Sequence, residues 1–91
     1  MIVTIRGKRW DLLFERLAKN RQCDGLCDPP QKPGKKIRIE QSLSGERRLE
    51  IILHELMHAG HWDMSEEAVE EFAADAARIL TKLGYKDMGN E

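Results

Sequence analysis

The chain has 91 residues, 41% of them hydrophobic and 34% charged, which indicates one small globular domain spanning residues 1–91 rather than a disordered segment. Its 15 basic and 16 acidic residues leave a net charge of −1, so overall charge favours no polyanionic partner. The basic residues crowd the first half without interleaved aromatic side chains, so nucleic acid is not favoured as a partner, although it stays open.

The first half of the chain alternates strand-like and helix-like patterns. Residues 2–6 are rich in β-branched side chains and bounded by Gly7, which predicts a short strand. Within residues 8–20 the apolar side chains recur at helical spacing, which predicts an amphipathic N-terminal helix with Trp10, Leu13, Phe14 and Leu17 on one face. Residues 20–36 hold three prolines and two glycines and are expected to form a long loop.

In residues 36–41, Ile37 and Ile39 alternate with charged neighbours, which predicts a half-buried strand that pairs with residues 2–6. A helix is predicted over residues 46–60, with Gly60 as its end and an apolar stripe of Leu49, Ile52, Leu53, Leu56 and Met57. Ser65 is a good N-cap for a last helix that ends near Leu83. We expect the buried face of that helix to comprise Val69, Phe72, Ala76, Ile79, Leu80 and Leu83.

These elements predict an α+β fold. It has a small two- or three-stranded sheet, an N-terminal helix and a C-terminal antiparallel helix hairpin, because a connection of about four residues forces two helices to run antiparallel.

No apolar run approaches the ~18 residues that a membrane span needs, and the apolar stretch before Arg6 is too short for a signal peptide. We therefore expect a cytoplasmic protein with no membrane partner. In a reducing compartment Cys23 and Cys27 are expected to be free thiols, since two cysteines alone make at most half of a structural zinc site.

A metal-binding motif lies on the first helix of the hairpin. His54, Glu55 and His58 form the pattern HExxH, and a spacing of four places both imidazoles on one helix face, where they can share a Zn²⁺ ion. Both histidines point away from the apolar stripe, so the helix is expected to present them to a cleft. Glu55 is then the candidate general base that deprotonates a zinc-activated water.

Residues 49–75 resemble the gluzincin type of zinc metallopeptidase, and in particular the compact SprT-like and ImmA-like proteins common in phages and bacteria. The first half of the chain matches this pattern only loosely. The resemblance implies a zinc-dependent hydrolase, an endopeptidase acting on peptide or protein substrates, in which a glutamate from the next helix completes the HExxH site.

Two registers of the hairpin provide that glutamate. Residues equidistant from the turn face each other, which pairs His58 with Glu67 as third ligand and leaves Glu71 to accept a hydrogen bond from His54. In the alternative register, one turn later, Glu71 binds the metal and Asp75 orients His54, a Glu-x-x-x-Asp spacing that also resembles thermolysin-like enzymes. The sequence favours Glu67 slightly.

Other parts of the mechanism are less determined. His61, Tyr85 and an arginine are candidates for stabilising the oxyanion, and the strand at 36–41 is a candidate edge to which an extended peptide adds. Two functions without catalysis stay open as well. One is a binding module that uses zinc for stability, and the other is a regulatory partner that docks through its acidic last helix.

Overall fold

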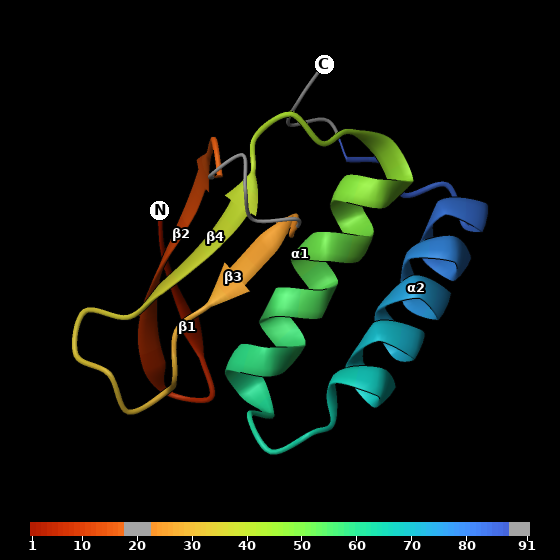
Figure 1. Cartoon of the computed structure of the whole chain (residues 1–91). Coiled ribbons are helices and arrows are strands. Elements are labelled where there is room, and N and C mark those ends of the chain that lie inside the picture. The colour runs from red at the N-terminus through yellow and green to blue at the C-terminus, as the bar shows by residue number, and fades with distance from the viewer. Residues whose placement is uncertain (18–22, 88–91) are drawn as a thin grey trace.

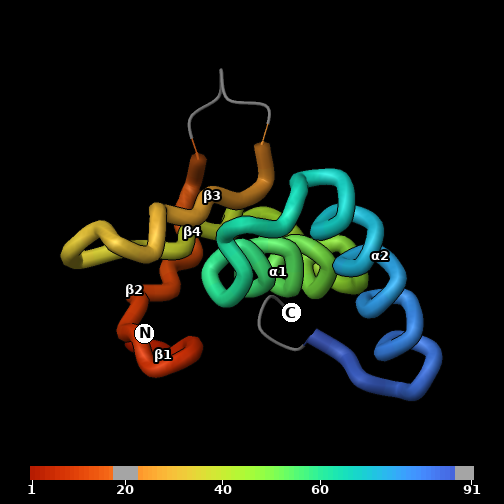
Figure 2. Tube along the Cα trace, turned by 90° about the horizontal axis from the view of Figure 1, so that it is seen from below, coloured from red at the N-terminus to blue at the C-terminus, as the bar shows by residue number. Residues whose placement is uncertain are grey.

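A computed structural model describes residues 1–17 and 23–87. The elements are β1 (Ile2–Ile5), β2 (Lys8–Glu15), β3 (Gly25–Cys27), β4 (Lys36–Glu40), α1 (Gly45–Gly60) and α2 (Glu66–Lys82). The four strands form one mixed sheet, α1 packs on one face of it, and α2 packs on the far side of α1 (Figures 1 and 2). The α+β class and the two C-terminal helices agree with expectation.

The expected two- or three-stranded sheet with an N-terminal helix is wrong, because residues 8–15 form strand β2. Arg6 and Gly7 both have positive φ, of 49° and 79°, which is typical of a two-residue hairpin turn, and this turn pairs β1 with β2 in antiparallel fashion. Trp10 and Leu12 are buried at alternate positions on the face that meets α1. The expected end of the helix at Asn20 lies outside the described residues.

The order of strands in the sheet is β1-β2-β4-β3. The expected pairing of residues 36–41 with residues 2–6 is therefore wrong, since β4 lies between β2, to which it is parallel, and β3, to which it is antiparallel. Strand β3 lies within residues 20–36, so the prediction of a continuous loop there is wrong. Ile37 and Ile39 of β4 are fully buried and form the centre of the core.

The buried side chains of α1 are Arg48, Ile51, Glu55 and Ala59, which recur at helical spacing and face the sheet. In α2 the buried residues are the small side chains Val69, Ala73 and Ala77. The larger side chains Phe72, Ile79 and Leu83 are exposed, contrary to expectation. Among the described elements α2 contacts only α1, so a narrow strip of it is covered. No helix in the described part of the chain is long and apolar enough to cross a bilayer.

A buried ion pair fastens the segment after α2 to the core. The Nε atom of Arg48 lies 2.6 Å from Oδ2 of Asp87, and both side chains are about nine-tenths buried. The guanidinium also stacks over the Phe14 ring at 4.2 Å. The pair thus joins α1, β2 and the C-terminal segment.

We expect Arg48→Ala to lower the free energy of unfolding by about 3 kcal/mol, because it leaves the buried Asp87 carboxylate without this positive partner. The neighbouring Arg47 is the matched control: its ion pairs with Asp24 and Glu50 are solvent-exposed, so Arg47→Ala should cost less than about 1 kcal/mol. Urea denaturation of both variants measures the difference. Equal losses would show that Arg48 acts as an ordinary surface residue.

Candidate metal centre

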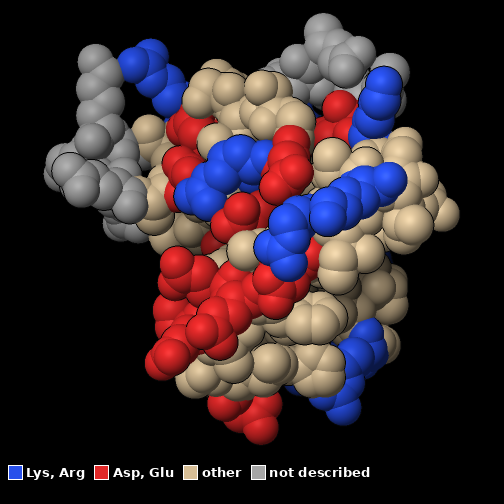
Figure 3. Space-filling model, turned by 90° about the vertical axis from the view of Figure 1, so that its right-hand side faces the viewer, with Lys and Arg blue, Asp and Glu red and all other residues tan. Residues whose placement is uncertain are grey.

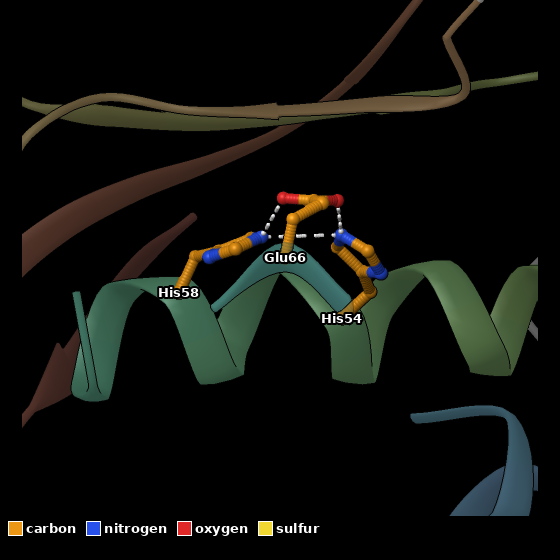
Figure 4. A group of neighbouring side chains, drawn as sticks. All are labelled: His54, His58 and Glu66. Carbon is orange, nitrogen blue, oxygen red and sulfur yellow. Dashed lines mark hydrogen bonds and ion pairs between the residues drawn. The ribbon is translucent and has the colours of Figure 1, made fainter. Parts of the chain in front are cut away.

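Three donor groups from two helices converge near the C-terminal end of α1 (Figure 4). Residues 61–65, which we call the hairpin loop, join this end of α1 to α2. The Nε2 atoms of His54 and His58 lie 3.2 Å apart. The carboxylate of Glu66 spans them, with Oε1 at 2.9 Å from His54 Nε2 and Oε2 at 2.9 Å from His58 Nε2. Both imidazole side chains are largely buried, at 14% exposed, and the glutamate side chain is 68% exposed. Among the described residues, this is the only group of three His, Cys, Asp or Glu side chains whose ligand atoms lie close enough together to hold one metal ion.

The start of α2 places Glu66 at this point. His61 donates its backbone N–H to Met57 O and closes α1, and the Met64 N–H bonds to His61 O within the loop. Ser65 then caps α2, its Oγ accepting a hydrogen bond from the Ala68 N–H at 3.1 Å. Glu66 is the first residue of α2, where unpaired N–H groups and the helix dipole favour a carboxylate.

The donor set fits Zn²⁺. Two imidazole nitrogens and one carboxylate are a ligand set of catalytic zinc sites, which keep a fourth position for water. Two ligand atoms bound tetrahedrally at about 2.0–2.1 Å lie roughly 3.3–3.4 Å apart, close to the 3.2 Å between the two Nε2 atoms. The oxygen–nitrogen distances of 2.9 Å are slightly shorter, so the exposed Glu66 side chain would move outward by a few tenths of an ångström on binding.

The structure brings neither Glu67 nor Glu71 to the histidines. Both line a separate acidic cavity between the helices, together with Glu50, Glu70 and Asp75. The equidistance rule predicted residue 67 opposite His58, but successive residues on a helix point about 100° apart. A shift of one residue along α2 therefore moves the carboxylate from the two histidines to the acidic cavity. Asp75 likewise does not orient His54.

Glu55 lies on the buried face of α1 beside the two histidines, and it is only 6% exposed. It packs against β3 at Gly25. A Cβ atom at position 25 would lie 2.7 Å from Glu55 Oε2 and 2.8 Å from its Cγ, so only glycine leaves room for the carboxylate. Burial, and to a smaller extent the negative charge of Glu66, raises the pKa of Glu55 to about 7. A group with that pKa can both take and return a proton near neutral pH.

Glu55 and the three donors open into a cavity of about 440 Å³. Its remaining lining consists of β3 and the hairpin loop, and comprises Gly25, Leu26, Cys27, Trp62 and Met64. Trp62 is 46% exposed, and its ring meets that of His58 edge-on with centroids 6.3 Å apart. The cavity thus combines a polar floor on α1 with an aromatic side chain at its rim.

Cys27 lines this cavity, but its surroundings disfavour the thiolate form that a nucleophile needs. Burial raises the pKa of its thiol to about 12, and the negative charges of Glu55 and Asp28 contribute to the shift. The thiol therefore stays protonated. Cys23 and Cys27 are both free, as expected from the sequence.

The candidates for oxyanion stabilisation do not reach the site. His61 and Tyr85 are exposed and do not line the cavity, and none of the arginines within residues 1–17 and 23–87 lines it either. Glu66, Gly25 and Trp62 line the cavity but were not predicted from the sequence. The position of Glu66 directly after the capping Ser65 was the one available signal for it, whereas Gly25 sits in a segment that carried no strand pattern.

Comparisons with known protein families, with curated protein sequences and with solved structures found no match to this chain. The function is therefore inferred from the site itself.

Proposed function

We propose that the protein is a zinc-dependent peptidase whose metal is held by His54, His58 and Glu66. The convergence of three zinc-type donor atoms beside a buried carboxylate, inside an open cavity, is the observation that carries the proposal. Zinc bound there would supply Lewis acidity, which acidifies water and polarises a peptide carbonyl.

Glu55 would act as the general base. Its carboxylate lies beside the donor atoms on the same helix, and the cavity wall at Gly25 holds it in place. It would take the proton from the attacking water and return it to the leaving amine. A pKa raised to about 7 suits both steps, since the group changes protonation state near neutral pH.

The sheet edge to which a substrate peptide could add is not the expected strand at residues 36–41. Strand β4 is interior, so β3 is the edge strand beside the cavity. In the β3–β4 ladder Asp24 O accepts from the Glu40 N–H, and the Asp28 N–H donates to Lys36 O. Backbone groups alternate in direction along an antiparallel strand, so those of Gly25 and Cys27 point away from β4. An extended peptide could pair with them, which supports a peptide or protein substrate.

A second candidate is a zinc-stabilised module that binds a partner without hydrolysing it. Helix α2 contacts only α1 among the described elements, and a metal joining Glu66 to the two histidines would fasten the hairpin. In so small a domain that link would contribute substantially to stability. Catalysis separates the two candidates, because only the peptidase requires Glu55.

Substitution of the third ligand tests the metal site. We expect Glu66→Gln to weaken zinc binding by more than the roughly 10–100-fold that loss of an outer-shell partner costs, because an amide is a much poorer ligand than a carboxylate. Glu67→Gln, one residue further along α2, should leave the affinity unchanged. Isothermal titration of metal-free protein with Zn²⁺ measures both, and the parent should bind one ion per chain.

Two results would contradict the assignment. One is a parent protein that binds no zinc, and the other is a reversal in which Glu67→Gln loses the metal while Glu66→Gln keeps it.

A further inference from the structure

One flank of α2 carries a largely exposed apolar strip, which we call the outer strip and define as Phe72, Ala76, Ile79 and Leu83. Phe72 is 59% exposed, Ile79 52% and Leu83 68%. The face toward α1 is a different one, formed by the small residues Val69, Ala73 and Ala77. No described element other than α1 contacts α2. Large apolar side chains gathered in this way on a helix indicate a surface that is covered by a partner.

The spacing of the outer strip is that of a coiled-coil seam. Its members are separated by four, three and four residues, the alternation that keeps one side of a helix against a partner helix. Two copies running antiparallel would place Phe72 opposite Leu83 of the other copy and Ala76 opposite Ile79. Each layer of the seam then combines a larger with a smaller side chain.

The charges beside the outer strip identify the partner as a second copy in antiparallel orientation. Asp75 and Lys82 flank the strip on the same side, one heptad apart. Glu71 and Arg78 lie further around the helix, on the side of Asp75 and Lys82 away from the strip. The acids lie toward the start of α2 and the bases toward its end. On this side of the molecule, acidic side chains gather over the lower part and basic ones lie mainly above them (Figure 3).

Antiparallel pairing sets Asp75 of each copy against Lys82 of the other, whereas parallel pairing would set both charged positions beside the apolar Ala73 and Leu80 and leave them without a charged partner. Asp75 already pairs with Arg78 at 2.9 Å, but both side chains are more than half exposed, so this contact leaves room for a second partner.

We propose that the protein forms a homodimer through antiparallel packing of α2 on α2, with the outer strip as its seam. The interface lies on a flank of α2, roughly a quarter turn around the helix from the face that meets α1. The proposal does not depend on zinc or on peptidase activity.

Sedimentation velocity over a range of concentrations tests the dimer. The parent chain should sediment as a dimer, and Ile79→Glu should shift it to monomer by at least tenfold in the dissociation constant. Thr81→Glu, an exposed position of α2 off the strip, is the matched control and should leave the dimer intact. Because Ile79 is more than half exposed, circular dichroism should show that the helices of the variant are retained.

A charge exchange tests the orientation. Asp75→Lys alone and Lys82→Asp alone should each weaken the dimer, and the double variant should restore it, since antiparallel pairing brings the two positions together. A parent that is monomeric at about 1 mM chain would overturn the proposal, as would equal effects of Ile79→Glu and Thr81→Glu. Failure of the double variant to restore association would overturn the antiparallel arrangement.

Discussion

Replacement of Glu55 with glutamine is expected to lower peptide hydrolysis by roughly 100- to 10,000-fold, the usual contribution of a positioned general base. Glutamine has nearly the same shape, so it fills the same space against Gly25, but it cannot accept the proton of the attacking water. None of the three donor atoms belongs to Glu55, and zinc affinity should therefore change little. Cleavage of an unstructured fluorogenic peptide and zinc titration measure the two effects separately.

Glu46→Gln is the matched control for this experiment, since Glu46 is an exposed glutamate in the first turn of the same helix. It should retain both zinc and activity. A Glu55→Gln protein as active as the parent would remove the general base from the proposed mechanism. A parent that binds zinc with the proposed ligands, yet cleaves no peptide, would instead support the zinc-stabilised binding module.

Gly25→Ala is expected to lower hydrolysis by roughly 100-fold, because a displacement of about 1 Å of a catalytic group has effects of that size. The new Cβ would lie 2.7 Å from Glu55 Oε2 and 3.0 Å from Ile51 Cγ2, distances that force the carboxylate or β3 to move. Its nearest contacts do not include His54, His58 or Glu66, so zinc affinity should be retained. The same activity assay and zinc titration provide the comparison.

Gly60→Ala is the matched glycine control, because a Cβ there would meet Ile5 Cγ2 at 3.4 Å, an ordinary contact distance. A double-mutant cycle tests the cause directly. In the parent protein, Gly25→Ala should lower the free energy of unfolding by about 1–3 kcal/mol, as overpacking does. In a Glu55→Ala background the same substitution should cost clearly less, because the carboxylate that it meets is gone. An equal cost in both backgrounds would show that Gly25 does not position Glu55.

The motif and its helix could be predicted from sequence, because both depend on local spacing. His54 and His58 are four residues apart, and any helix brings such a pair to one face. The ends of α1 and α2 were also predictable to within about one residue, since Gly60, Ser65 and the apolar periodicity are local signals.

Strand β2 was not predictable in this way. Trp10, Leu13, Phe14 and Leu17 satisfy a helical period, while Trp10, Leu12 and Phe14 satisfy the period of a strand. Pairing with β1 across the Arg6–Gly7 turn and with β4 in parallel decides between the two periods. These pairings bring together residues up to about 25 positions apart, and a local sequence pattern cannot reveal contacts over that distance.

The sequence by itself therefore determined which residues of α1 are the candidate metal ligands and the candidate base, because a helix converts spacing directly into direction. Only the tertiary structure decided that Glu66 joins the histidines in place of Glu67 or Glu71, and that Gly25 shelters Glu55. The choice of Glu66 depends on the residue at which the hairpin loop ends and α2 begins, because a shift of one residue changes the direction of a side chain by about 100°. The position of Gly25 beside Glu55 depends on a contact between a helix and an edge strand that lie far apart in the chain.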